Sequence, residues 1–299
     1  MKILSSQEHS YAHIPVMTVE VVDHLNLQPD GAYLDGTIGA GGHATKILAQ
    51  LSLKGKLIGL DRDAEALEIC KNRFGASAHP IFTYKSSYHN FPKILDKLGI
   101  SKVNGILLDL GLSSMQLKSE TRGFSFNSSG ALDMRFDKEN SFSAVELISQ
   151  SSEEELANII FQFGEERRSR RIARSIKSAK NLLTATDLKE AIRRATPPQK
   201  RNKSLARVFQ AIRIAVNNEL ERLNKFLGLF IEHLSVGGRI VIMTYHSIED
   251  RMVKHAFRSL KQSGRLAILT KKPIVPTENE IKRNNRSRSA KLRVGEKLI

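Results

Sequence analysis

The sequence contains a single cysteine, Cys70, in 299 residues. One cysteine excludes an intramolecular disulfide and any zinc site built from several cysteines. The sequence also lacks an apolar run of about eighteen residues, the length that a membrane-spanning helix requires. Its first residues do not show the basic and apolar pattern of a secretory signal. These absences favour a cytoplasmic protein without disulfides or membrane anchors.

Acidic residues are also scarce relative to basic ones. The chain has 47 lysine and arginine residues against 31 aspartate and glutamate residues, a formal net charge of +16. Residues 165–203 hold thirteen basic residues against four acids, and residues 282–293 hold six against none. Phosphate contacts give affinity without sequence information, so both segments are candidate RNA-binding surfaces. The alternative is a solvated basic face without a partner.

Apolar strands alternate with amphipathic helices in the first 109 residues. Strands are expected at 31–35, 56–61, 80–84 and 103–109. This alternation indicates a parallel sheet covered on both faces. The alternation stops between about 116 and 196, where a loop and several helices are predicted. It resumes with a long helix over 205–234 and a glycine cap at 237–238. The remaining predicted elements are a strand at 239–245, a helix at 249–260 and strands at 266–270 and 291–294.

We therefore predict an α/β fold, a doubly wound and mostly parallel sheet with an inserted all-helical domain. The expected sheet domain comprises residues 1–116 and 205–299, and the expected insert comprises 117–204.

A glycine-rich turn follows the first predicted strand and reads Asp35-Gly-Thr-Ile-Gly-Ala-Gly-Gly-His43. Glycine lets the backbone turn sharply and lets a ligand approach closely, which makes Gly39, Gly41 and Gly42 candidate cofactor contacts. Asp61, at the end of the next strand, can accept hydrogen bonds from both ribose hydroxyls of an adenosine.

These features also fit a dinucleotide pocket, so the acid before the turn decides between cofactors. Asp35 can bind an ammonium group but would repel a pyrophosphate. S-adenosylmethionine (SAM) carries an ammonium group and no phosphate. The sequence therefore favours SAM.

Asp109 ends the fourth predicted strand. Because the carboxyl ends of parallel strands share one edge, this residue should face the same crevice as the glycine turn. It either contacts the reacting group, or it serves as a helix cap or cofactor contact without a chemical duty.

Motifs along almost the whole chain resemble the bacterial small-subunit ribosomal RNA cytosine-N4 methyltransferase family. Several of them lie outside a generic cofactor-binding fold, which makes the resemblance specific. They are His13-Ile-Pro-Val, the glycine turn, Leu107-Leu-Asp-Leu-Gly-Leu-Ser-Ser114, Gly123-Phe-Ser-Phe126, Leu132-Asp-Met-Arg135, Phe163-Gly-Glu-Glu-Arg167, Arg171-Ile-Ala-Arg174, Phe209 to Glu219, and Tyr245-His-Ser-Ile-Glu-Asp-Arg251.

The resemblance implies a class I SAM-dependent methyltransferase that methylates the exocyclic N4 of a decoding-centre (P-site) cytosine in 16S rRNA of the small ribosomal subunit. It implies cofactor contacts at Gly41, Gly42, His43, Asp61, Tyr88, Asp109 and Gln116. Two positions depart from the family pattern: Met115 stands where proline is usual, and Asn285 stands where the tail usually reads Asn-Pro-Arg.

Cytosine N4 is a poor nucleophile, because its lone pair is delocalised into the ring. A hydrogen-bond acceptor is needed to hold the amine, and Asp109 is the first candidate. Asp133 with Arg135, and His246 with Ser247, are candidates for orienting the base or a phosphate.

Two other features admit more than one interpretation. Phe124 and Phe126 either stack on an extruded cytosine or pack locally. His43 is expected to be a cap or cofactor contact, and no metal site is expected, because no second ligand accompanies it at helical or hairpin spacing.

Two other functions stay open at this stage. A nicotinamide-dependent oxidoreductase would share the glycine turn and Asp61, but it gives no reason for Asp35 or for the basic insert. A non-catalytic rRNA-binding assembly factor would explain the charge but not the pocket.

Overall fold

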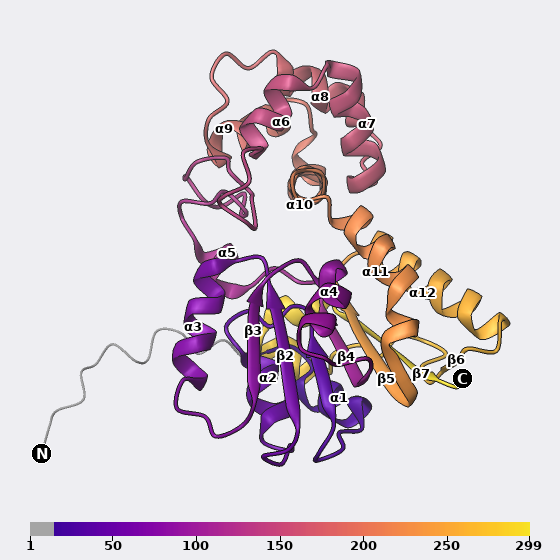
Figure 1. Ribbon diagram of the computed structural model, residues 1–299. Coiled ribbons are helices and arrows are strands. Elements are labelled where there is room, and N and C mark those ends of the chain that lie inside the picture. Colours follow the sequence, from indigo (N-terminus) through magenta and orange to yellow (C-terminus); the bar gives the residue numbers. More distant parts are fainter. Residues whose placement is uncertain (1–14) are drawn as a thin grey trace, which may run out of the picture. The chain divides into compact units, whose positions relative to one another are not determined.

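The computed structural model describes residues 15–299, which divide into two compact units (Figure 1). The first unit comprises the described residues up to Gly111 and Phe226–Ile299, and the second comprises Leu112–Lys225. Each unit has its own apolar core.

A seven-stranded sheet forms the centre of the first unit. Its strands are β1 (Ala32–Asp35), β2 (Lys56–Asp61), β3 (Ile81–Lys85), β4 (Val103–Asp109), β5 (Leu234–Thr244), β6 (Leu266–Ile268) and β7 (Lys291–Lys297). They lie in the order β3-β2-β1-β4-β5-β7-β6. The first five are parallel, and β7 runs antiparallel between β5 and β6. The predicted doubly wound, mostly parallel sheet is confirmed.

Helices cover both faces of this sheet, as the apolar strands require. Helices α1 (Thr18–Leu25), α2 (Gly42–Leu48) and α3 (Ala64–Phe74) share one core cluster with alternate strand residues such as Leu107. Helices α4 (Phe91–Lys97), α11 (Glu219–His233) and α12 (Ser247–Gln262) are joined by contacts between phenylalanine rings. The ring centroids of Phe91 and Phe226 lie 5.5 Å apart, and those of Phe230 and Phe257 lie 6.1 Å apart.

Parallel pairing brings the ends of three strands to one edge. Asp35, Asp61 and Asp109 are the last residues of β1, β2 and β4. The chain order of the strands reverses between β1 and β4, which is where open α/β sheets form their ligand crevice.

The second unit is helical, with α5 (Ser114–Lys118), α6 (Ala144–Gln150), α7 (Glu153–Gly164), α8 (Ser169–Lys177), α9 (Ala185–Arg194) and α10 (Arg201–Asn217). The expected insert ended at residue 204, within α10. The whole helix belongs to this unit, because Val208 and Ile212 are buried in the same core as Leu156 and Ile160 of α7.

The predicted long helix over 205–234 is wrong, because the helix breaks at Asn218. This residue adopts a left-handed conformation with φ 51° and ends α10 before α11 begins. Asparagine tolerates that conformation better than most residues with a side chain. With this break, no helix in residues 15–299 is both long enough and apolar enough to cross a membrane.

The predicted glycine cap at 237–238 is also wrong. Both glycines lie inside β5. The pairing of β5 with β4 is irregular there, because Val103 pairs with Leu234 and Gly105, two residues later, pairs with Arg239. Gly237 has φ +72°, so the strand bulges instead of starting after a capped helix.

Asn217 generates a prediction about the stability of the second unit. Its buried side chain donates hydrogen bonds to the backbone oxygens of Met134 (2.7 Å) and Arg213 (3.0 Å) and accepts one from the Phe136 N–H (2.8 Å). Asn217→Ala removes these three hydrogen bonds and should lower the free energy of unfolding by about 2 to 4 kcal/mol in a urea titration. The control Asn202→Ala, at an exposed site of the same helix, should change it by less than about 0.5 kcal/mol. Equal effects of the two changes would contradict the anchoring role.

Candidate active site

Asp35 is an almost fully buried acid at the end of β1, with 1% of its surface exposed. Its Oδ1 atom accepts a hydrogen bond from the Thr37 N–H at 3.1 Å, whereas Oδ2 has no partner among the described residues. Burial raises the pKa of Asp35 to about 7; the charge of His43 and the Thr37 hydrogen bond lower it, and the charges of Asp109 and Asp61 add to the rise. A buried oxygen without a partner indicates a place for a cationic ligand.

Asp61 holds the glycine turn in place. Its Oδ2 atom accepts a hydrogen bond from the Gly39 N–H at 2.8 Å, and its Oδ1 atom accepts one from the Asp63 N–H at 2.9 Å. Burial raises its pKa to about 6 in spite of these two bonds. The Arg62 backbone N–H also donates to this carboxylate. A carboxylate has about four acceptor sites, so a further hydrogen bond from a ribose hydroxyl is chemically available.

Asp109, at the end of β4, lies between two side chains from other elements. The Nε2 atom of His43 lies 3.5 Å from its Oδ2 atom, an electrostatic contact longer than a good hydrogen bond. The hydroxyl of Tyr245, directly after β5, donates a hydrogen bond to the carboxylate. Burial would raise the pKa of Asp109, but these neighbours and the Gly111 N–H outweigh it and lower the pKa below its ordinary value. Asp109 is therefore held as a carboxylate.

Tyr245 was not predicted as a site residue. Its ring lies over Gly111, where an added Cβ would come within 2.6 Å of it. Burial first, and then the charge of Asp109, raise the pKa of its hydroxyl, so it stays a hydrogen-bond donor.

The glycines of the turn serve different purposes. Gly41 has φ +84°, and a Cβ there would lie 2.5 Å from the Phe74 ring, so the fold itself requires this glycine. Gly39 has φ +53°, but the nearest atoms to its added Cβ lie 3.9 Å away. Gly42 packs against Pro15, the first described residue of the motif that begins at His13; His13 itself lies outside the described residues. The space next to the Cα atom of Gly39 is open, whereas the corresponding space at Gly41 is filled by Phe74.

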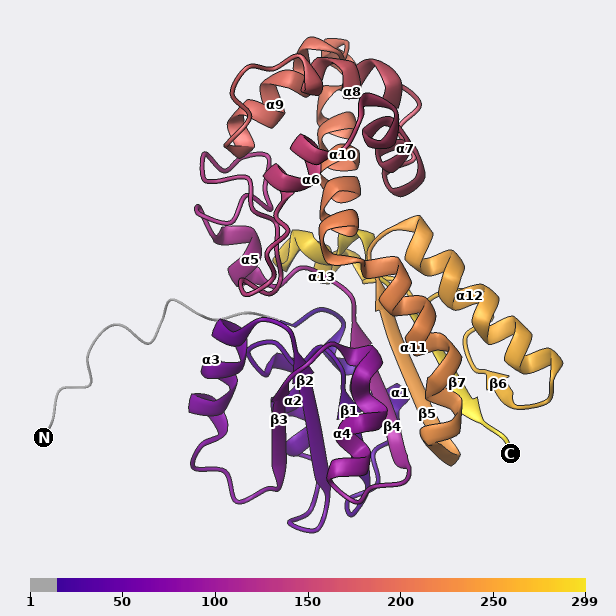
Figure 2. The ribbon, with the colours of Figure 1, turned by 45° about the horizontal axis from the view of Figure 1, so that its top comes forward.

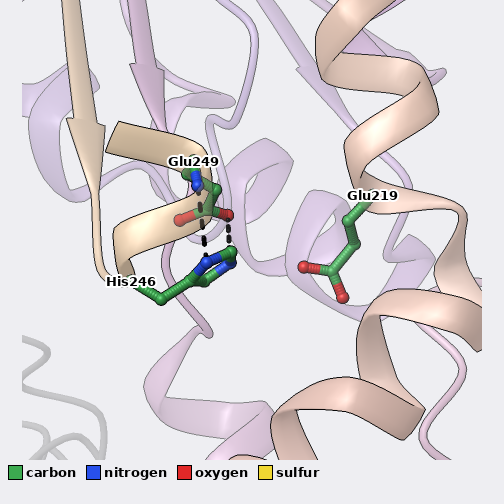
Figure 3. Close-up of side chains that lie close together, drawn as sticks. All are labelled: Glu219, His246 and Glu249. Atoms are coloured by element: carbon green, nitrogen blue, oxygen red, sulfur yellow. Dashed lines mark hydrogen bonds and ion pairs between the residues drawn. The ribbon is translucent and has the colours of Figure 1, made fainter. Parts of the chain in front are cut away.

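His246 pairs with an acid of its own helix (Figure 3). It caps the N-terminus of α12, where its Nδ1 atom accepts a hydrogen bond from the Glu249 N–H at 3.5 Å. Its Nε2 atom lies 3.1 Å from Oε1 of the buried Glu249, whose Oε2 accepts a hydrogen bond from the Tyr245 N–H. This pair fixes the end of β5 and with it Tyr245.

Comparison with known proteins identifies the family. The model of the MraW methylase family matches residues 10–298. The chain belongs to the MraW methylase family. It is 47% identical over 290 residues to the ribosomal RNA small subunit methyltransferase H of Thermosipho africanus, covering 96% of this chain and 98% of that protein. It is also 47% identical to the protein of the same name from Thermotoga neapolitana, covering 97% of each. The predicted SAM-dependent methyltransferase is confirmed.

Two predicted site residues, Asp133 and Gln116, lie in the second unit and are described within it. The carboxylate of Asp133 accepts hydrogen bonds from the backbone and guanidinium of Arg135, with Nη2 at 2.7 Å from Oδ2. Gln116 forms a capping box with Ser113 at the start of α5, in which its Oε1 atom accepts the Ser113 N–H at 3.1 Å. Both side chains thus have local structural partners in this methylase.

The two phenylalanines proposed as stacking platforms are core residues. Phe124 is 5% exposed and stacks on Phe136 with centroids 5.6 Å apart. Phe126 packs against the same core and meets Phe209 edge-on at 5.9 Å. Of the two interpretations, local packing is correct for the structure described.

The raised pKa of Asp35 generates a prediction about pH. Below pH of about 7 the carboxyl is protonated, so pairing with the ammonium of SAM requires loss of a proton. SAM affinity measured by calorimetry should therefore fall as the pH is lowered from 8 to 6, approaching tenfold for each unit at the acid end. Asp35→Asn should bind SAM weakly with a much flatter pH dependence. A dependence that is the same in both proteins would show that Asp35 does not bind the ammonium group and would assign the titration to another group, such as Asp61.

Proposed function

We propose that this chain transfers a methyl group from SAM to the exocyclic N4 of the P-site cytosine of 16S rRNA in the small ribosomal subunit. The names of its relatives and its membership of a methylase family support the reaction and the substrate. The observation that carries the proposal is the carboxylate cluster at the sheet edge, with its partnerless Asp35 oxygen and ionised Asp109. We further propose that the reaction takes place in the cytoplasm.

The residues at the sheet edge fit SAM. The buried Oδ2 atom of Asp35, which has no partner among the described residues, supports an ammonium contact there, and Asp61 is the proposed ligand of the ribose. Gly39, Gly41 and Gly42 form the turn between them. His43 begins α2 and reaches Asp109. Tyr88 and Gln116 complete the proposed contacts from the family resemblance.

Asp109 acts as a hydrogen-bond acceptor and does not carry a proton of its own. Bound SAM supplies an electrophilic methyl group on a sulfonium. Because its pKa lies below the ordinary value, Asp109 remains charged at neutral pH. It can accept a hydrogen bond from the amine of the target base and lie close to the positive charge that develops on the nitrogen. This interaction stabilises the transition state more than the ground state, so it lowers the activation free energy. His43 and Tyr245 both contact its carboxylate and position it. Asp133 and His246, with their local ion pairs, stay proposed contacts for base or phosphate.

The basic helix α8 is a proposed phosphate-binding surface in the second unit. Arg170, Arg171 and Arg174 are exposed, whereas Ile172 and Ile176 lie in the core. The loop before α8 is anchored separately, because buried Glu166 accepts a hydrogen bond from Ser204 at 2.9 Å and lies 3.7 Å from Arg207. Arg174 pairs with Glu153 at 3.2 Å, so Arg170 and Arg171 are the arginines of α8 proposed to contact RNA.

Incubation with labelled SAM and undermethylated small subunits, followed by mass mapping of the labelled nucleotide, tests the function. We expect one methyl group on N4 of a decoding-centre cytosine. Label on another nucleotide would refute the proposed target. Binding of NADH without binding of SAM would favour an oxidoreductase, and rRNA binding without label would favour an assembly factor.

Substitutions at the end of β4 separate binding from chemistry. Asp109→Ala should lower kcat by about 10² to 10⁴ while changing SAM affinity much less. Equal losses in both would make Asp109 a cofactor ligand only.

Tyr245→Phe should lower kcat by roughly tenfold and move the acidic limb of the pH profile upward, because the pKa of Asp109 rises when the hydroxyl is removed. Tyr84→Phe, on the edge strand β3, is the matched control and should leave the profile unchanged. An unmoved profile in Tyr245→Phe would limit Tyr245 to packing over Gly111.

A further inference from the structure

The segment between β6 and β7 forms a closed loop at the ligand-binding edge of the sheet. Ile274 and Leu292 exchange two backbone hydrogen bonds of 2.9 Å and close the loop over residues 275–291. Lys291, at the start of β7, pairs with Thr244 at the carboxyl end of β5. The loop therefore projects from the same edge at which Asp35, Asp61 and Asp109 end their strands. Figure 2 shows its helix α13 (Glu278–Arg283) at that end of the sheet.

The loop is held in place by its acidic and polar side chains. The Oε1 atom of Glu280 accepts a hydrogen bond from the Met17 N–H at 2.6 Å. Met17 is buried beside the turn in which Pro15 packs on Gly42 of the cofactor loop. Ser287 is fully buried and donates a hydrogen bond to the Asn284 backbone oxygen at 2.8 Å. The loop is thus tied both to β7 and, through Met17, to the start of α1.

Five of the six basic residues between Lys282 and Arg293 separate into two classes, and the sixth, Arg286, is half-buried. Arg293 is buried and donates hydrogen bonds of 2.7 and 3.2 Å to Asp250, which Lys291 also approaches at 3.6 Å. These two residues neutralise an internal acid and are not available to a partner. Lys282, Arg283 and Arg288, by contrast, are exposed and form no ion pair with the residues that the structure describes. We define these three as the edge cations.

We propose that the edge cations form an RNA-contact surface on the first unit, beside the cofactor crevice and separate from the basic helix of the second unit. This inference rests on the proposed rRNA substrate and specifies where part of it binds. An RNA phosphate backbone is the partner that exposed cations without internal acids favour, because contact releases condensed counterions. Two acids lie near the edge cations. Glu280 accepts the Met17 N–H, while Glu278 is exposed at the start of α13. The edge cations lie in the segment next to the end of β5, so they would hold the nucleotides that flank the target base.

The chain offers a matched control for charge. Lys54, Lys56 and Lys102 are exposed, and they lie at the opposite edge of the sheet, before or at the start of β2 and β4. Replacing the three residues of either set by glutamine removes three positive charges. Long-range electrostatic effects on RNA binding should therefore be similar, whereas local contacts should differ.

The test measures the affinity of the full chain for deproteinised small-subunit rRNA at several salt concentrations. Lys282→Gln, Arg283→Gln and Arg288→Gln together should weaken binding by roughly tenfold or more and reduce the slope of log affinity against log salt by about 2. The control triple variant should weaken it much less. SAM affinity and the thermal midpoint should be unchanged in both, because none of the six side chains takes part in the cofactor site or the core.

Each outcome has a distinct meaning. Equal weakening by the two triple variants would overturn the edge surface and leave only a general effect of net charge. Loss of SAM affinity or of folding in the edge variant alone would overturn it in favour of a structural role. A wild-type chain that binds SAM but binds neither the deproteinised rRNA nor intact small subunits would overturn the proposed substrate itself, a result that the comparison between variants cannot produce.

Discussion

The structure of the first unit depends on the electrostatics of three carboxylates at one edge of its sheet. Parallel pairing places the ends of β1, β2 and β4 together, so Asp35, Asp61 and Asp109 are brought close whatever their charge. Thr37 links two of them, because its N–H donates to Asp35 while its hydroxyl accepts the Asp109 N–H at 2.7 Å. The protein resolves the repulsion unequally: burial raises the pKa of Asp35 and Asp61, while His43 and Tyr245 keep Asp109 charged. A cationic ligand such as the proposed SAM would offset the remaining repulsion between the carboxylates.

Much of this site follows from the sequence, because it depends on where strands end. The periodicity of the first 109 residues defines four strands, and three of them end in the acids Asp35, Asp61 and Asp109. What the sequence does not reveal is the pairing between elements. His43 begins α2 and Tyr245 follows β5, and only the folded sheet brings both to Asp109. The sequence also does not reveal why residue 41 must be glycine, because the ring that fills the space beside it belongs to Phe74, at the end of α3.

The errors and reassignments share a physical cause, which is tertiary packing overriding local pattern. Asn218 breaks an otherwise continuous apolar period, since Asn217 beside it binds the loop at Met134 and Phe136. Phe124 and Phe126 sit in a polar, glycine-containing loop that suggests exposure, yet they fill the core of the second unit. Family motifs such as those around Glu166, Asp133 and Asn217 therefore include residues that build the second unit, alongside residues proposed to act on the substrate.

The insertion of a whole helical unit between β4 and β5 has a consequence for folding. These strands pair directly, with Asp109 opposite Met243, although Leu112–Lys225 lies between them in the chain. If that segment were unfolded, closing it would cost about 2 kcal/mol more in chain entropy than closing a loop one tenth as long. Prior folding of the second unit replaces the flexible loop by a compact body with its own core. The central strand pair of the sheet then depends on the order in which the two units fold, and a destabilised second unit slows formation of the cofactor site without touching any residue in it.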